Sequence, residues 1–303
     1  MVYTVTLNPA LDYVMHVEKL RYDDINRTTA EEIYYGGKGI NVSVILSRLG
    51  IKNTALGFLA GFTGKELEKM LINDGINCDF NYLKSGNTRI NVKIKADTQL
   101  DINANGPHIN SADIEALLSK LEGIQSGDYL VLAGSIPANL PDDIYRRILL
   151  RVANRGVNVA VDATGDLLMN VLQYKPFLVK PNHHELGDLF GTTVDTDEDI
   201  VRYAKRLQDM GAVNVLVSRA SKGAMLIDEY GNSHSIGVAP GELVNSVGCG
   251  DSMVAGFLAG YIEKNDYSYA LKLGSACGNA TAFSPELATK DEIIAVLKNG
   301  FNE

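Results

Sequence analysis

Residues 129–161 read YLVLAGSIPANLPDDIYRRILLRVANRGVNVAV, and this stretch decides our prediction of the fold. The continuous apolar runs at 129–133 and 157–161 are typical of strands that are buried on both faces, and 142–154 between them has the pattern of a helix. A strand, a crossover helix and a second strand indicate two parallel neighbours in one sheet.

The same alternation extends outward along the chain. We therefore predict an α/β fold in which a mostly parallel central sheet is covered by helices on both faces. Strands are expected at 3–7, 55–59, 177–179 and 214–218, and helices at 39–50, 64–71, 183–190, 197–210 and over most of the chain from Gly250 on.

Two segments, about 11–36 and 88–105, depart from this alternation. Within the second, residues 89–95 alternate between polar and apolar, which is the pattern of a sheet with one face in water. We predict a small antiparallel sheet, inserted in the α/β fold as a lid. No repeat or flexible linker separates it, so residues 1–303 are expected to form a single domain.

The composition narrows the class of protein. The 28 basic and 37 acidic residues give a net charge of −9, which argues against a broad surface for nucleic acid or for an anionic membrane. Cys78, Cys249 and Cys277 show no CxxC spacing, which fits a reducing compartment. The N-terminal stretch lacks the features of a signal peptide, so we expect a cytoplasmic protein.

Glycines gather in Gly36-Gly37-Lys38-Gly39-Ile40-Asn41, where a predicted helix begins. A glycine backbone lets a ligand approach closely, and a helix N-terminus beside a lysine attracts a phosphate. The spacing matches neither G-x-G-x-x-G nor G-x-x-x-x-G-K-[ST], which argues against a dinucleotide fold and against a Walker-type NTPase. A glycine turn that merely starts a helix is the alternative interpretation.

A second glycine turn, Val247-Gly248-Cys249-Gly250-Asp251, precedes a helix rich in small residues. Free amides in such a turn bind anions, and Asp251 beside them is suited to accept a proton from an attacking hydroxyl. Because a helix N-terminus favours the carboxylate, we expect Asp251 to be a weak base. The alternative is that Asp251 only caps the helix. Cys249 is interpreted as a small buried thiol, since no histidine is near it in sequence.

The stretch Lys180-Pro181-Asn182-His183-His184-Glu185 lies between a predicted strand and a predicted helix. Asn182 and Glu185 are suited to order the water around Mg²⁺, which prefers few carboxylates. The two histidines also raise the possibility of zinc. Adjacent side chains diverge on a helix, however, and the H-E-x-x-H pattern fails because position 188 is aspartate.

These motifs occur in the order found in the ribokinase-like (PfkB) carbohydrate kinases, which the chain resembles over essentially its whole length. Within that family it is most similar to the bacterial kinases of fructose 1-phosphate. The resemblance implies a ribokinase-like three-layer αβα fold, ATP and Mg²⁺ as cofactors, and a homodimer formed through the lid. The matching stretches are 8–12, 36–41, 88–93, 134–137, 180–185 and 247–251.

The resemblance also implies roles for individual residues on the sugar side. Asp251 would deprotonate the acceptor, the 6-hydroxyl of D-fructose 1-phosphate, to give fructose 1,6-bisphosphate. The moving phosphoryl group would be stabilised by the amides of Gly248, Cys249 and Gly250. Sugar hydroxyls would be held by Asp12, Gly37 and Asn41, and the substrate phosphate by Lys38, Arg89, Arg27 and Ser135.

On the nucleotide side, the resemblance implies that Asn182 and Glu185 organise Mg²⁺ and the ATP phosphates, with water between these side chains and the metal. The loop that would lie against ATP consists of Ser218, Arg219, Ala220, Ser221, Lys222 and Gly223, with Gly250 at the phosphates and Asn279 near the adenine. Two positions depart from the family pattern. Cys249 replaces a small Ala or Ser, and Ala220 replaces a glycine and is expected to require a negative φ.

Other functions remain as alternatives. Tagatose 6-phosphate or fructose 6-phosphate as the acceptor would keep the same mechanism. Lys38 and Arg89 together anticipate a charged substrate, which argues against a nucleoside. A non-catalytic sugar-phosphate-binding protein would be expected to have lost Asp251 or the glycine turn, and both are present.

Overall fold

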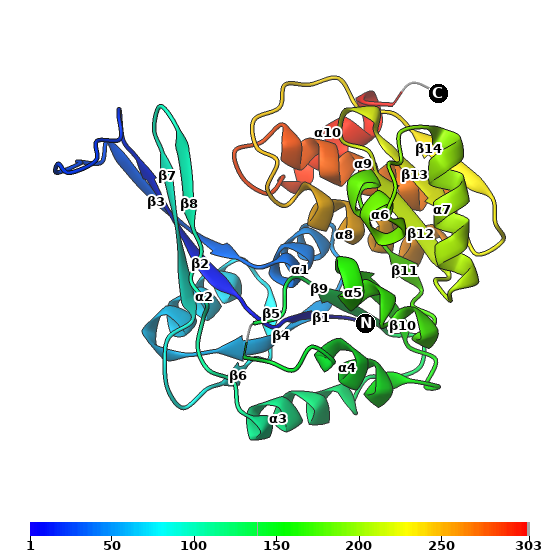
Figure 1. The fold of residues 1–303 in the computed structure, drawn as a ribbon, viewed down its shortest axis with the longest axis horizontal. Coiled ribbons are helices and arrows are strands. Elements are labelled where there is room, and N and C mark those ends of the chain that lie inside the picture. Colours follow the sequence, from blue (N-terminus) through cyan, green and yellow to red (C-terminus); the bar gives the residue numbers. More distant parts are fainter. Residues whose placement is uncertain (138, 302–303) are drawn as a thin grey trace.

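The computed structural model describes residues 1–137 and 139–301, which form two sheets of unequal size (Figure 1). The larger sheet is parallel except at one edge, where β12, β13 and β14 are antiparallel neighbours. The prediction of a mostly parallel sheet is therefore confirmed. In spatial order its strands are β14 (Ser233–Ile236), β13 (Ala224–Ile227), β12 (Asn214–Ser218), β11 (Leu178–Val179), β10 (Asn158–Asp162), β9 (Tyr129–Ala133), β1 (Val2–Thr6), β4 (Asn53–Leu59) and β5 (Asn77–Cys78), with β6 (Asn81–Tyr82) also paired to β4.

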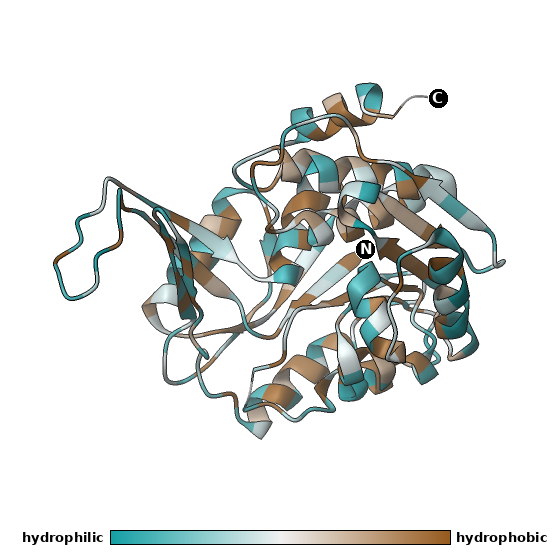
Figure 2. Ribbon diagram, turned by 45° about the horizontal axis from the view of Figure 1, so that its top comes forward, coloured by the Kyte–Doolittle hydropathy of each residue, from teal (hydrophilic) through white to brown (hydrophobic). Residues whose placement is uncertain are grey.

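Helices cover both faces of this sheet, as the continuous apolar strands predict. In β9, Leu130 and Leu132 pack into one core and Val131 and Ala133 into the other, so the whole strand is apolar. Figure 2 shows the strands of this sheet as mainly hydrophobic. The first core contains α3 (Ser111–Leu121), α4 (Ile144–Val152), α5 (Gly165–Met169), α6 (His183–Phe190) and α7 (Asp197–Asp209); the second contains α1 (Lys38–Arg48), α8 (Cys249–Lys264), α9 (Tyr267–Ala282) and α10 (Lys290–Asn299). Among the described residues, no helix is both long enough and apolar enough to cross a membrane.

The smaller sheet projects from the larger one at the side where α2 (Gly61–Asn73) lies (Figure 1). We call this sheet the lid. It contains β3 (Ala30–Gly36), β2 (Ala10–His16), β7 (Arg89–Lys95) and β8 (Gln99–Ile102), in that spatial order.

The lid is not purely antiparallel, and in this respect the prediction is wrong. The hairpins β2–β3 and β7–β8 are antiparallel, but β2 and β7 pair in parallel. The reason is that both hairpins leave the core at the same place and in the same direction. The strand β2 follows β1, while Thr88, which precedes β7, accepts a hydrogen bond from the Ala60 amide and another from the Thr63 hydroxyl.

Candidate active site

A cavity of about 650 Å³ lies between the larger sheet and the lid. Thr6 ends β1 and Ala133 ends β9, and both line it. From β1 the chain proceeds to β4 on one side, whereas β9 pairs with β1 on the other side, so the direction of the crossovers reverses between β1 and β9. Open α/β sheets bind their ligands at the carboxyl ends of the strands at such a reversal.

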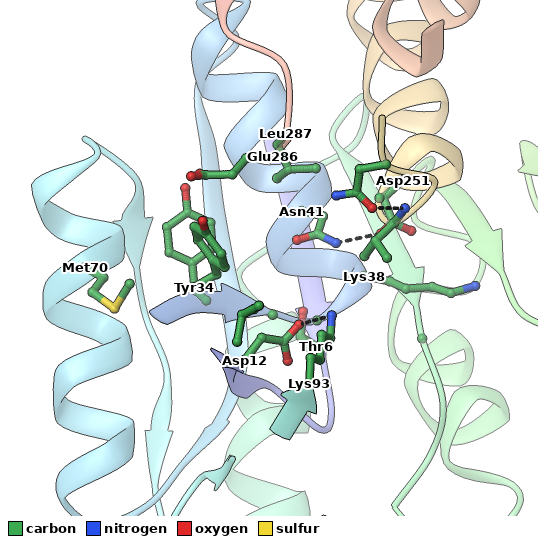
Figure 3. Close-up of a pocket in the computed structure, with 18 of the residues that line it drawn as sticks. Thr6, Asp12, Tyr34, Lys38, Asn41, Met70, Lys93, Asp251, Glu286 and Leu287 are labelled. Atoms are coloured by element: carbon green, nitrogen blue, oxygen red, sulfur yellow. Dashed lines mark hydrogen bonds and ion pairs between the residues drawn. The ribbon is translucent and has the colours of Figure 1, made fainter. Parts of the chain in front are cut away.

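Asp251 lies in the first turn of α8 and lines the cavity. Its side chain is 6% exposed, and the Asn41 side-chain amide donates a hydrogen bond to its Oδ2 at 2.8 Å (Figure 3). Burial raises the pKa of Asp251 to about 6, and the charge of Asp162 adds to this rise, while Asn41, Lys38 and Lys180 oppose it. The expectation of a weak base is therefore wrong, because loss of hydration outweighs the helix N-terminus.

The turn before Asp251 leaves backbone amides available. Gly248 adopts φ +80, a left-handed conformation that favours glycine, and α8 begins directly after it. Because the Ser252 amide makes the first helical bond, to the Gly248 carbonyl, the amides of residues 249–251 have no acceptor within the helix. A Cβ on Gly250 would lie 3.2 Å from Lys180 Nζ, so the lysine ammonium lies directly against this turn.

Cys249 is half-buried in the same turn. Its thiol donates to the Asn245 carbonyl at 3.5 Å, and burial raises the pKa of the thiol to about 11. A thiol that keeps its proton is a poor nucleophile, which agrees with the interpretation of Cys249 as a small packed residue.

A buried carboxylate joins the two lysines near Asp251. Asp162 ends β10, is 2% exposed, and its Oδ1 lies 3.3 Å from Lys38 Nζ and 3.6 Å from Lys180 Nζ. Burial alone would lower the pKa of Lys38, but Asp162 and Asp251 outweigh it and hold the pKa above its ordinary value. Sequence reasoning gave Asp162 no role and Lys180 none of its own. The feature that could have identified Asp162 and Lys180 as site residues is their position at the carboxyl ends of two adjacent parallel strands.

On the lid side, Asp12 is held from two directions. Its Oδ2 forms an ion pair with Lys93 Nζ at 2.7 Å, and its Oδ1 accepts a hydrogen bond from the Asn91 amide at 2.8 Å. Asp12 and Lys93 both line the cavity. Neither Lys93 nor Asn91 was predicted as a site residue, although both lie in the stretch whose alternation predicts the lid.

Arg89 lines the same part of the cavity and is held by neutral partners. Its guanidinium donates to the carbonyls of Asn8 at 3.2 Å and Ala104 at 3.3 Å. Burial lowers the pKa of Arg89, and the charge of Asp12 partly offsets this effect. Gly37, Lys38, Asn41 and Ser135 also line the cavity, whereas Arg27 is exposed in the β2–β3 connection and does not.

Asn182 and Glu185, the two residues predicted to hold Mg²⁺, form hydrogen bonds with each other's backbone. Asn182 and Glu185 form a capping box at the start of α6, in which each side chain accepts a hydrogen bond from the backbone amide of the other, at 2.8 and 2.7 Å. In the described part of the chain, no group of three or more His, Cys, Asp or Glu side chains is arranged to hold a metal.

The residues predicted to bind the nucleotide lie at the end of β12, in the turn that follows it, and in α9, and none of them lines the cavity described above. Arg219 is buried and pairs with Asp197 and the Ser235 hydroxyl, and Asn279 bonds the Ala239 amide and the Ser275 carbonyl. Ala220 has φ +49, so the expected negative φ is wrong: the tight turn over residues 220–222 requires the left-handed conformation despite the methyl group. The roles in nucleotide binding of Ser218, Arg219, Ala220, Ser221, Lys222, Gly223 and Asn279 stay predictions.

The comparisons of this chain with known proteins agree with one another on the class of protein. The model of the pfkB family of carbohydrate kinases matches residues 5–293. Among curated proteins, the 1-phosphofructokinase of Bacillus subtilis is 44% identical over 98% of this chain and 97% of its own length. The D-tagatose-1-phosphate kinase of Bacillus licheniformis is 37% identical over 95% of this chain and 94% of its own length. Among solved structures, phosphofructokinase-2 of Escherichia coli in complex with substrates and products has a TM-score of 0.92 at 27% identity and covers 98% of each chain.

Proposed function

The chain belongs to the pfkB family of carbohydrate kinases, with the ribokinase-like fold, and we propose that it is a 1-phosphofructokinase. It would transfer the γ-phosphoryl group of ATP to the 6-hydroxyl of D-fructose 1-phosphate, giving fructose 1,6-bisphosphate and ADP. The observation that carries this proposal is the buried Asp251 carboxylate, which faces a cavity whose other wall, on the lid, presents the cation of Arg89.

Asp251 is suited to be the base. A carboxylate with a pKa of about 6 is ionised at neutral pH and is a stronger base than an ordinary aspartate. The bond from Asn41 fixes Oδ2 and leaves Oδ1 for the acceptor hydroxyl. As the bond between O6 and the γ-phosphorus forms, the bond from that phosphorus to the β,γ-bridging oxygen breaks, and the hydroxyl proton passes to Asp251.

The negative charge of the phosphoryl group that moves in this step needs fixed hydrogen-bond donors and cations to stabilise it. We assign the amides of Gly248, Cys249 and Gly250 to the transferring phosphoryl group, because those of Cys249 and Gly250 have no acceptor within α8 and Gly248 directly precedes them in the same turn. Lys180 lies against the same turn, and Lys38, which was predicted to hold the substrate phosphate, is joined to Lys180 through Asp162. We propose that both cations act on the transferring phosphoryl group. Stabilisation by fixed dipoles and charges is the main source of catalysis in phosphoryl transfer.

ATP is the phosphoryl donor of this family, and Mg²⁺ is part of the proposal. Glu185 uses Oε2 in its capping box, and its charge reaches Lys38, whose pKa it helps to raise. A single carboxylate that acts through water fits Mg²⁺, which keeps most of its hydration. Asn182 and Glu185 would hold the hydrated ion, and the ion would neutralise charge on the ATP phosphates.

The lid is assigned to the substrate phosphate. Arg89, Lys93 and Lys95 line the cavity from β7, and Arg89 is paired only with carbonyl groups among the described residues. A guanidinium without a carboxylate partner is suited to a phosphate, which it binds in a bidentate manner. Ser135 and the more distant Arg27 remain proposed contributors.

The opposite face of the lid supports a homodimer. The strand register places Ile33, Tyr13, Val92 and Ile102 in one row across the lid. Ile33 is 52% exposed and also borders the cavity at the edge strand β3, while Ile102 is 54% exposed and Ile90 and Leu100 on the same face are exposed too. Because an apolar sheet face is unfavourable in water, we propose that the lids of two subunits pack together through it.

The proposal is tested by an ATP-consumption assay coupled to ADP formation, with several acceptors in parallel. We expect the highest kcat/KM with D-fructose 1-phosphate, and much lower values with fructose 6-phosphate and tagatose 6-phosphate. D-tagatose 1-phosphate is the second candidate, because a relative with 37% identity bears that name and the two sugars differ only in configuration at C4. If none of these acceptors is phosphorylated, the remaining candidate function is that of a non-catalytic sugar-phosphate-binding protein.

A further inference from the structure

The ion pair between Asp12 and Lys93 forms part of the wall of the cavity. Their side chains are 14% and 17% exposed, so the pair is largely shielded from water while it still faces the cavity. Figure 3 shows Asp12 and Lys93 beside Thr6 on one side of the cavity, apart from Asn41 and Asp251. The pair therefore lies on the side away from the proposed base.

This pair has unused hydrogen-bonding capacity. A lysine ammonium has three donors, and one of them binds Asp12. Each oxygen of Asp12 accepts one bond and has room for another. Thr6 Oγ1 lines the same region, is buried, and has no partner among the described residues. A hydroxyl group that donates to Asp12 and accepts from Lys93 would satisfy both members of the pair.

The neighbour of the pair is the proposed phosphate site. Arg89 lies two residues before Asn91 on the same side of β7, and the charge of Asp12 acts on Arg89. The cavity thus presents a hydroxyl site directly beside a phosphate site. In the furanose form of a ketose 1-phosphate, the ring carbon that carries the phosphate arm also carries the anomeric hydroxyl.

We propose that Asp12 and Lys93 bind this anomeric hydroxyl, and that Lys93 thereby sets the preference for ketose 1-phosphates over ketose 6-phosphates. A ketose 6-phosphate that presents its 1-hydroxyl to Asp251 has C5 beside the phosphate arm, and C5 carries hydrogen in place of the hydroxyl. Lys93 and Asp12 then lose both hydrogen bonds while water is excluded from them, which is costly for charged groups. This inference rests on the proposed function.

The test uses 2,5-anhydro-D-mannitol 1-phosphate, an analogue that matches the furanose of fructose 1-phosphate but carries hydrogen in place of the anomeric hydroxyl. The kcat/KM for each substrate is expressed per concentration of furanose. For the wild-type chain we expect the analogue to be worse by about 10- to 100-fold, the usual effect of losing a hydrogen bond to a charged group. In Lys93→Met this difference largely disappears, because fructose 1-phosphate loses the same bond.

Lys95→Met is the matched control. Lys95 lies two residues further along β7, lines the same cavity and carries the same charge, but it is exposed and does not contact Asp12. We expect Lys95→Met to keep the full difference between the two substrates, whatever its effect on their common affinity. Thermal unfolding and the KM for ATP show whether each variant is folded.

Two results would overturn the inference alone: a wild-type chain that uses both substrates equally well, or a Lys93→Met chain that keeps the wild-type difference. The first needs no variant, so it decides even if Lys93→Met does not fold. A wild-type chain without turnover of fructose 1-phosphate would instead overturn the proposed function, and this inference with it.

Discussion

Asn41 Nδ2 donates a hydrogen bond to Asp251 Oδ2 across 2.8 Å, and so joins the first turn of α1 to the first turn of α8. The bond holds the carboxylate in place and opposes the rise in its pKa caused by burial. Asn41, expected from the sequence to hold a sugar hydroxyl, thus also orients the proposed base.

The pH dependence of turnover follows from this pair. If the carboxylate form of Asp251 is the active one, its pKa of about 6 in the ligand-free chain means that kcat/KM should fall as the pH drops through 6. Asn41→Ala removes a bond that favours the carboxylate, and should shift this acidic limb to higher pH. A profile of kcat/KM between pH 4.5 and 8.5 measures both. An unshifted limb in the variant would show that the bond does not act on the base.

Asp251→Asn should separate activity from stability. We expect kcat to fall by about three orders of magnitude while the phosphosugar still binds, because the base is lost and the shape is kept. Because the pKa of Asp251 is raised in the folded chain, ionisation of this buried carboxylate destabilises the fold. The destabilisation develops as the pH rises from about 4 to 6 and is complete above about 6. At pH 8 the variant should therefore be more stable by about 1–3 kcal/mol, and at pH 4 nearly equal.

Arg89→Ala should act on one substrate only. Its guanidinium is held by carbonyl groups and faces the cavity, so we expect the KM for the phosphosugar to rise by about 10- to 100-fold. The KM for ATP should stay near the wild-type value. Initial rates with each substrate varied in turn measure both constants, and an equal effect on the two would remove Arg89 from the sugar-phosphate site.

Cys249→Ala should change little. The proposed anion site uses the backbone amide of this residue and not its side chain, so we expect kcat to change by less than about tenfold. With a thiol pKa of about 11, roughly one molecule in ten thousand carries the thiolate at pH 7, so alkylation should be slow. Iodoacetamide labelling followed by mass spectrometry checks this, with the same chain unfolded in urea as the comparison, since Cys78 and Cys249 are both partly buried in the folded chain.

Ala220→Gly should stabilise the chain. At φ +49 the alanine methyl group is strained, and the strain exceeds the extra freedom that glycine gives the unfolded chain. We expect the free energy of unfolding in urea to rise by up to about 1 kcal/mol. The same change restores the glycine of the family pattern, so the KM for ATP of the variant also tests the proposed nucleotide loop. A destabilised variant would show that the methyl group is well packed.

The elements that have strong apolar patterns were predictable. The helix at 183–190 and the strand at 214–218 have their predicted bounds, because a buried element imposes its period on the sequence. The hairpin of β13 and β14 was missed, since β14 is a short edge strand with the polar sequence SHSI. Antiparallel edges of this kind leave little signal in a single sequence.

The site was predictable where glycine turns mark it, and less so where it depends on tertiary contacts. The pattern of Gly248 and Asp251 indicates a turn at a helix N-terminus, which the structure contains. Asp162 and Lys180 lie at the carboxyl ends of two strands without a glycine turn beside them in sequence, and they come together only because those strands are neighbours. The pKa of Asp251 depends on its burial by the assembled layers, which a local helix argument does not include.

The parallel pairing of β2 with β7 has a consequence for how the chain folds. The bond between Asp12 and Asn91 closes a loop of 79 residues, whereas α1 and β4 follow one another directly. Contacts between distant segments form late, because closing a long loop costs entropy before it gives any stability. The layered core needs a still longer closure, because β1 pairs with β9 and joins Val2 to Tyr129. During refolding, the core and the sugar-phosphate wall should therefore recover together and late, and acceptor affinity should return only with the complete fold.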